Sequence, residues 1–207
     1  MKSRSDHINF QRAYFNRVVD IFKLPLPDEV DQRTREIVAL TGVSKTDRLL
    51  DVGTGTGVLV QYFLEFGVPA SSIVGCDLSS QMLGEAQSRY PEVTFVQADI
   101  DELPLEYGPF TVAFFNGCFG NLYNPLATLT KTVQLLSKDG RIVISHPLGN
   151  AFVAELKAKE PELVLRLLPA QADLLDWCAE LNCNLEAFST AEDFYLAILD
   201  KGTLNKD

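Results

Sequence analysis

The chain has 207 residues, a formal net charge of −10, 46% hydrophobic residues and 22% charged residues. This length and composition predict one soluble globular domain. The acidic balance argues against nucleic acid or an anionic membrane surface as a partner, because both require clustered Lys and Arg side chains. No apolar run is long enough to span a membrane, and no secretory leader is recognisable, so we expect a cytoplasmic protein. The four cysteines form no CxxC pair, which predicts free thiols in a reducing compartment.

The first 42 residues predict a helical cap. Residues 8–22 carry a broad apolar stripe with helical spacing. The prolines at positions 25 and 27 end this helix, and residues 28–41 predict a second helix that stops at Gly42. His7 is expected to be a surface residue near the end of the chain.

Short apolar segments alternate with helical segments between residues 48 and 145. The segments 48–52, 72–76, 93–97, 110–115 and 141–145 predict strands, and 58–66, 79–88 and 124–136 predict helices. Ser79 and Asn124 are suited to cap helix N-termini, Pro125 suits a first helical turn, and residues 138–140 predict a turn. Five continuous apolar strands separated by helices predict a parallel sheet that is covered on both faces.

The C-terminal part departs from this alternation. Residues 150–168 predict an apolar helical insertion, and residues 170–181 predict a further helix. The segments 184–189 and 194–200 predict two strands, and their short link of about four residues requires an antiparallel pair at the sheet edge. We therefore expect one domain over residues 1–207. It would comprise an N-terminal helical cap (1–42), a cofactor-binding core (43–146), a helical insertion (147–169), and a C-terminal helix with a β-hairpin (170–207).

A glycine-rich turn follows the first strand of the core. Asp51 lies inside an apolar segment, and Gly53, Gly55 and Gly57 follow on alternate positions. Glycines allow a tight turn and a close approach of the backbone to a ligand. Strand, glycine turn and helix together predict a nucleotide-type cofactor site in a doubly wound sheet. The G-x-G-x-x-G pattern of dinucleotide sites would require glycine at Val58, which disfavours a nicotinamide cofactor.

Polar side chains stand at the ends of the next three strands. Asp77 ends the second strand, Asp99 follows the third, and Asn116 follows the fourth. The carboxyl ends of parallel strands meet at one edge of a sheet, where ligands bind. The Asp77 carboxylate can accept hydrogen bonds from two ribose hydroxyls, and the Asp99 carboxylate can accept one from an adenine amino group. These positions predict one cofactor site at this edge.

These motifs resemble those of class I S-adenosylmethionine-dependent methyltransferases. The matching runs are DVGTGTG at 51–57, GCDLS at 75–79, QADI at 97–100 and FTVAF at 110–114, within residues 45–146. The resemblance implies an α/β, Rossmann-like fold. Its doubly wound seven-stranded sheet is mostly parallel, with an antiparallel C-terminal hairpin strand. It also implies S-adenosyl-L-methionine as cofactor and S-adenosyl-L-homocysteine as product.

The resemblance also implies a role for each matching position. Asp51 and the glycine loop would contact the amino-acid end of the cofactor, Asp77 the ribose, and Asp99 the adenine edge. Leu78 and Met82 would pack on the adenine, and the segment after the fourth strand would lie near the methyl group. The implied cofactor-binding residues are Asp51, Gly53, Thr54, Gly55, Gly57, Asp77, Leu78, Met82, Asp99, Ile100, Asn116 and Gly117.

His146 directly follows the fifth strand, so we expect it to face the same crevice. The usual pKa of histidine suits a general base, and the alternative is that His146 only shapes the turn or lines the pocket. No metal site is predicted. Aromatic side chains would line a pocket for a small, partly apolar acceptor. These candidate substrate-binding residues are Tyr14, Phe15, Phe119, Tyr123 and Phe152.

The predicted function is methyl transfer to oxygen or carbon of a small organic molecule. Two alternatives remain open at this point: a non-catalytic regulatory protein that binds S-adenosylmethionine, and a protein methyltransferase. The sequence leaves both a monomer and a homodimer open.

Overall fold

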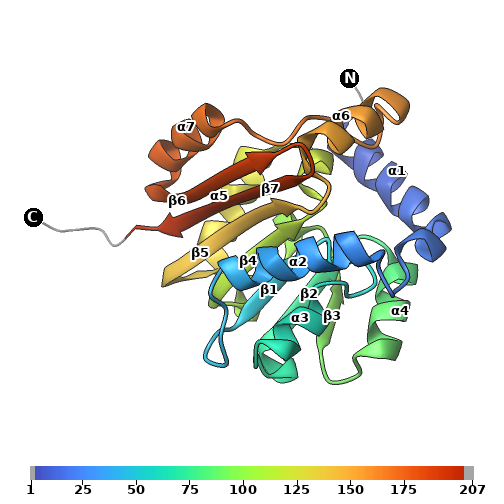
Figure 1. The fold of residues 1–207 in the computed structure, drawn as a ribbon, viewed down its shortest axis with the longest axis horizontal. Coiled ribbons are helices and arrows are strands. Elements are labelled where there is room, and N and C mark those ends of the chain that lie inside the picture. The colour runs from blue at the N-terminus through green and yellow to red at the C-terminus, as the bar shows by residue number, and fades with distance from the viewer. Residues whose placement is uncertain (1–2, 203–207) are drawn as a thin grey trace, which may run out of the picture.

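A computed structural model describes residues 3–202, so the predicted outer limits of the domain, at residues 1 and 207, lie outside the described residues (Figure 1). Seven strands form one sheet in the order β3-β2-β1-β4-β5-β7-β6. The first five strands are parallel, and β7 is antiparallel to both β5 and β6, which confirms the predicted fold class. The strands are β1 (Leu49–Val52), β2 (Ile73–Asp77), β3 (Thr94–Gln97), β4 (Phe110–Asn116), β5 (Leu136–His146), β6 (Cys183–Ala191) and β7 (Phe194–Lys201).

Helices cover both faces of this sheet, as the continuous apolar strands predict. Successive strand residues point to opposite faces, so Leu49 packs with α2 (Asp28–Leu40) and α3 (Val60–Glu65), whereas Leu50 packs with α5 (Pro125–Leu135) and α7 (Gln171–Leu181). Figure 1 shows α2 and α3 in front of the sheet. The helix α4 (Ser80–Arg89) lies against β2 and β3. Among the described residues, no helix combines the length and the apolarity needed to cross a membrane.

The predicted helix caps are confirmed. The Ser79 hydroxyl oxygen accepts a hydrogen bond from the backbone N–H of Met82 at 3.1 Å, and α4 begins at the next residue. Asn124 accepts from the backbone N–H of Ala127 at 3.3 Å, with Pro125 in the first turn of α5. Each cap satisfies a backbone donor that the helix itself leaves unpaired.

The N-terminal helix differs from its predicted range. The helix α1 (Arg4–Arg17) begins earlier, because Ser3 and Asp6 form a capping box in which each side chain accepts from the other residue's backbone N–H. The chain leaves the helix at Val18 and continues as a short 3-10 helix, η1 (Val19–Phe22). The prediction of one helix over residues 8–22 is therefore wrong at both ends.

Three connections also differ from prediction. The predicted turn at residues 138–140 belongs to β5, which begins at Leu136 and pairs with Phe110 before an irregularity in the register. The insertion is helical only in α6 (Gly149–Lys159), since Pro161 lacks a backbone donor and disfavours helical geometry at the preceding residue. The strands β6 and β7 are joined by two residues rather than about four.

Candidate functional site

The carboxyl ends of β1 to β5 open into one cavity of about 570 Å³. Each strand end contributes a polar side chain to its lining, in chain order Asp51, Asp77, Asp99, Asn116 and His146. The strand order reverses between β1 and β4, so the cavity lies at the topological switch point of the sheet, where open α/β sheets bind ligands. The predicted convergence of these polar groups in one crevice is therefore observed.

The glycine loop serves both the backbone turn and close packing. Gly53 and Gly55 have positive φ angles of 65° and 57°, which favour glycine. A Cβ atom on Gly53 would lie 2.8 Å from the Cβ atom of Cys118, whereas one on Gly55 would meet no atom within 4 Å. The backbone at Gly55 therefore faces open space that a ligand can occupy. Gly57 does not line the cavity. Its φ angle is 77°, and a Cβ there would lie 3.1 Å from the ring of Tyr90, so this glycine serves both the turn and packing against the end of α4.

Asp77 is held by two backbone donors. One carboxylate oxygen accepts from the N–H of Gly55 at 2.9 Å, and the other accepts from the N–H of Ser79 at 2.8 Å. Burial raises the pKa of Asp77, and these backbone hydrogen bonds oppose the shift. Each carboxylate oxygen can accept a further hydrogen bond. The group is therefore fixed in place and retains capacity for two ligand hydroxyls.

Asp51 is almost completely buried, with 2% of its surface exposed. Its carboxylate accepts a hydrogen bond from the Thr54 hydroxyl at 2.6 Å. Burial raises the pKa of Asp51 to about 7; the Thr54 hydrogen bond opposes this shift, and the negative charge of Asp77 adds to it. A cationic ligand group beside Asp51 would favour its ionised form.

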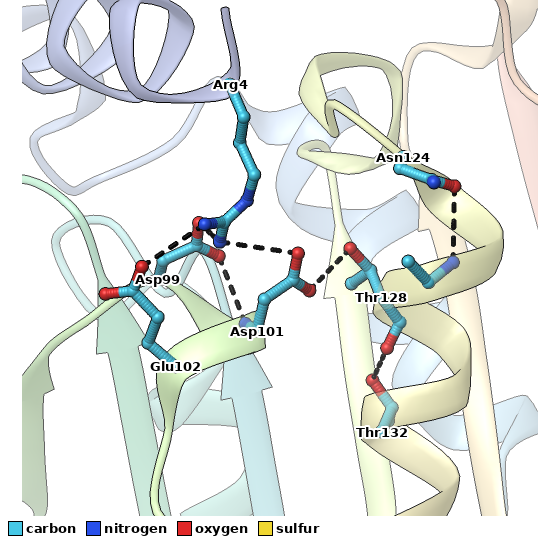
Figure 2. A network of polar contacts seen from close by, with 8 residues as sticks. Arg4, Asp99, Asp101, Glu102, Asn124, Thr128 and Thr132 are labelled. Carbon is cyan, nitrogen blue, oxygen red and sulfur yellow. Dashed lines mark hydrogen bonds and ion pairs between the residues drawn. The ribbon is translucent and has the colours of Figure 1, made fainter.

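Asp99 belongs to an ion-pair network that reaches from α1 to α5 (Figure 2). The guanidinium group of Arg4 pairs with Asp99, with Glu102 at 3.2 Å and with Asp101 at 3.4 Å. Asp101 in turn accepts from the Thr128 hydroxyl on α5 at 2.8 Å. Burial raises the pKa of Asp99, while the backbone N–H of Asp101 and the charge of Arg4 oppose the shift. Arg4 was not predictable from the sequence, because no local pattern connects it with a carboxylate 95 positions away.

The rest of the N-terminal segment contacts three other loops of the site. His7 donates a hydrogen bond to the backbone oxygen of Asn121 at 2.8 Å, beyond β4. The Asn16 side chain accepts from the Ser79 hydroxyl at 2.7 Å, and Thr56 of the glycine loop donates to the backbone oxygen of Phe22 at 2.6 Å. The expectation that His7 lies at the surface is wrong, because it is only 4% exposed.

His146 lines the cavity at the end of β5 and is 7% exposed. Its Nδ1 accepts a hydrogen bond from the backbone N–H of Leu148 at 3.2 Å. The ring packs against Phe152, with 5.6 Å between the ring centroids. Burial lowers the pKa of His146 to about 4. The predicted position is thus observed, but its only basic nitrogen already accepts a hydrogen bond.

Three of the five predicted substrate-binding aromatics line the cavity, namely Tyr14, Phe15 and Phe152. Phe119 does not, because it is fully buried against Phe115 and Trp177, with centroid distances of 5.8 and 6.0 Å. Tyr123 also lies outside the lining, and its ring centroid is 6.0 Å from that of His7.

Most of the lining that the sequence did not identify is apolar. It includes Val18, Ile21, Phe22, Leu148, Leu156 and Val164. Among residues 3–202, no Lys or Arg side chain lines the cavity. The same part of the chain holds no group of three or more His, Cys, Asp or Glu side chains arranged to hold a metal ion. Apart from Gly57, all predicted cofactor-binding residues line the cavity: Asp51, Gly53, Thr54, Gly55, Asp77, Leu78, Met82, Asp99, Ile100, Asn116 and Gly117.

Sequence comparison relates this chain to methyltransferases. A family model described as a methyltransferase domain matches residues 50–144. The demethylmenaquinone methyltransferase of Chlamydia caviae is 30% identical over 154 residues, which cover 69% of this chain and 66% of that protein. The corresponding protein of Chlamydia felis is 35% identical over 101 residues, which cover 47% and 43%. The chain spans about half the length of several such relatives, including 53% of the demethylmenaquinone methyltransferase of Paenarthrobacter aurescens.

Solved structures share the fold over nearly the whole chain. The magnesium protoporphyrin IX methyltransferase of Synechocystis, crystallised with bound SAH, superposes with a TM-score of 0.69 at 18% identity, covering 94% of this chain and 98% of that one. The 1,6-didemethyltoxoflavin-N1-methyltransferase of Burkholderia thailandensis superposes with a TM-score of 0.70 at 18% identity, covering 98% and 92%.

Proposed function

The chain belongs to the class I S-adenosylmethionine-dependent methyltransferase family, and we propose that it transfers a methyl group to oxygen or carbon of a small, largely apolar acceptor. The observation that carries this proposal is the cavity in which five polar strand ends face an otherwise apolar lining. S-adenosylmethionine, the cofactor of the family, supplies a methyl group that is already activated on a cationic sulfur. The protein therefore has to align the acceptor and exclude water.

The residues at the strand ends fit this cofactor. Asp77 has free acceptor capacity on both carboxylate oxygens, which suits the two hydroxyls of a ribose. Asp51 accepts a hydrogen bond from Thr54, the residue before the open backbone at Gly55, and its carboxylate suits a cationic amino group. We assign Asp99 and the backbone of Ile100 to the adenine edge and place Leu78 and Met82 against its ring, since all four line the cavity beyond β2 and β3.

Other groups would face the methionine portion and the acceptor. We place Asn116 and Gly117 near the methyl group, because they follow β4 at the switch point. Residues 1–42 and 147–169 would form the acceptor side, since their described parts supply the apolar lining. His146 is the candidate catalytic residue at the boundary between the two sides.

The acceptor would be uncharged. The only acidic side chains in the lining are the three that we assign to the cofactor, and the described lining offers an anionic acceptor no Lys or Arg side chain as a partner. The names of the curated relatives also favour an apolar acceptor of the demethylmenaquinone type. We place the protein in the cytoplasm, because all four cysteines are unpaired.

Two measurements test this proposal. Calorimetry should detect binding of S-adenosylmethionine and S-adenosylhomocysteine, and radiolabelled methyl groups should pass to 1,4-dihydroxynaphthalene kept reduced with dithionite. Absence of binding by both compounds would overturn the proposal. Binding with no transfer to this probe or to any fraction of a cell extract would favour the regulatory alternative. Label that appears only in the protein fraction would indicate a protein methyltransferase.

A further inference from the structure

The hydrogen bonding of His146 determines which of its nitrogens carries the proton. The backbone N–H of Leu148 points at Nδ1, with 3.2 Å between the two nitrogens. A backbone N–H can only donate, so Nδ1 contributes a lone pair. The proton of the neutral ring is therefore on Nε2.

Nε2 is available to a ligand. Within residues 3–202, this nitrogen has no hydrogen-bond partner in the protein, although the ring lines the cavity. The Phe152 ring packs beside it. On β7, Tyr195 is paired with His146 in the sheet register. The Tyr195 hydroxyl does not bind this nitrogen, because it donates to the backbone oxygen of Pro169 at 2.8 Å. His146 thus presents one unused N–H donor in a largely apolar space.

The hydrogen bond from Leu148 also opposes a role of His146 as a general base. A proton could be taken up only at Nδ1, which would break the hydrogen bond from Leu148 and leave two donors facing each other. The resulting cation would be buried, and burial already lowers the pKa of His146 to about 4. Within the described lining, Asp51, Asp77 and Asp99 are the only other charged side chains, and none of them contributes to this shift.

Building on the function proposed above, we propose that His146 binds an oxygen atom of the methyl acceptor through Nε2–H and does not remove a proton. A donated hydrogen bond withdraws electron density from the oxygen that accepts it. The bound oxygen would therefore be a neighbour of the methylated atom rather than the methylated atom itself. The acceptor would then be an uncharged molecule with a carbonyl or hydroxyl beside its reactive atom, and the proton it loses would pass to water.

Nitrogen-15 NMR tests the protonation state directly. The chain has only two histidines, so spectra of histidine-labelled protein can be assigned by comparison with the His146→Gln variant. We expect His146 to carry its proton on Nε2 and to remain neutral from pH 5.5 to 8. A proton on Nδ1, or a titration near pH 6.5, would overturn the proposal whether or not the protein proves to be a methyltransferase.

Paired substitutions test the contact with the acceptor. The amide nitrogen of glutamine can reach the position of Nε2, whereas that of asparagine reaches only the position of Nδ1. With S-adenosylhomocysteine-loaded protein, we expect 1,4-dihydroxynaphthalene to bind about tenfold more tightly than naphthalene, as one to two hydrogen bonds allow. His146→Gln should keep most of this preference, and His146→Asn should lose it.

The outcomes separate this inference from the proposed function. If wild-type protein binds the cofactor but shows no preference for the dihydroxy compound, or if both variants lose the preference equally, His146 is not the donor and the proposed function stands. If wild-type protein does not bind the cofactor, the proposed function fails, and the NMR result still decides the state of His146.

Discussion

The two halves of the cavity are held in place by different forces. In the half assigned to the cofactor, backbone N–H groups of Gly55 and Ser79 hold Asp77, and three glycines with positive φ angles form the turn. In the acceptor half, apolar side chains from η1, α6 and the segment that follows it supply the lining. Some of these side chains are exposed at the rim, including Ile21 at 75%.

This difference indicates how the two halves can change. Hydrogen bonds from the backbone depend on strand register and turn geometry, so a shift in either would disturb every ligand contact in the cofactor half. Contacts between apolar side chains are non-directional, and their contribution follows the area removed from water. The acceptor half can therefore accommodate substitutions that alter its shape while the cofactor half stays unchanged.

The largest expected effect is in the cofactor half. Asp77→Ala removes the acceptors for two ligand hydroxyls and leaves the N–H groups of Gly55 and Ser79 without partners. Hydrogen bonds to a charged group contribute about 1.5–3 kcal/mol each, so we expect cofactor affinity to fall by about 100-fold or more. Calorimetry measures this change. Asp176→Ala, which removes one acidic group from the exposed face of α7, is the control and should bind normally. Equal affinity in both variants would contradict the role of Asp77.

A smaller effect should follow from the pKa of Asp51. Below its pKa of about 7, the carboxyl of the free protein is increasingly neutral and attracts a cationic amino group less well. We expect the affinity for S-adenosylhomocysteine to fall about tenfold from pH 8 to pH 6, as a single titration allows. Asp51→Asn should bind S-adenosylhomocysteine weakly at both pH values, without the tenfold change in affinity. If its affinity changed with pH as much as that of wild-type protein, Asp51 would not be the group that contacts the cationic amino group.

The same pKa predicts a change in stability. The folded state holds the proton of Asp51 more tightly than the unfolded chain does. The free energy of unfolding therefore falls as the pH rises from 3.8 to about 7, where the folded protein has to ionise this buried carboxyl. Asp51→Asn should therefore unfold at a higher temperature than wild-type protein at pH 8 while binding the cofactor less well. Thermal scans of the ligand-free proteins measure this change.

The cofactor half was also the more predictable from sequence. Apolar strands, alternate glycines and acids at strand ends are local patterns, and the register of a parallel sheet brings them together at one edge. Aromatic composition carries no such information. Phe119 and Phe152 are equally apolar, yet Phe119 packs on the α7 side of the sheet and Phe152 lines the cavity.

Contacts between distant parts of the chain were not predictable. Arg4 and His7 lie in a polar stretch that resembles a solvent-exposed end, and their partners are separated from them by about 100 positions. Only the folded chain places α1 against the loops after β3 and β4. The break at Val18 was missed for a related reason, since the apolar side chains that continue past it line the cavity rather than a helix interface.

Truncation of Phe152 tests the acceptor half. Phe152→Ala removes apolar contact area, and a partly exposed side chain of this size contributes about 1–1.5 kcal/mol, so the KM for the acceptor should rise roughly tenfold. Steady-state kinetics with 1,4-dihydroxynaphthalene measures this change, and the affinity for S-adenosylhomocysteine should stay within about twofold of wild type. Leu175→Ala, which truncates an exposed apolar residue on α7, is the control. A similar loss in both affinities would show that the two halves are coupled.

The smallest expected effect concerns the contact that joins the two halves. Arg4 belongs to α1 on the acceptor side, and its guanidinium group pairs with Asp99 on the cofactor side (Figure 2). Its side chain is 35% exposed, and pairs of this kind contribute about 0–1 kcal/mol. We therefore expect Arg4→Gln to weaken cofactor binding by about two- to fivefold at low salt and less at high salt. Arg17→Gln, at the other end of α1, should leave binding unchanged. Tighter binding in Arg4→Gln would instead mean that Arg4 competes with the adenine for Asp99, so that α1 would restrict the cofactor half rather than support it.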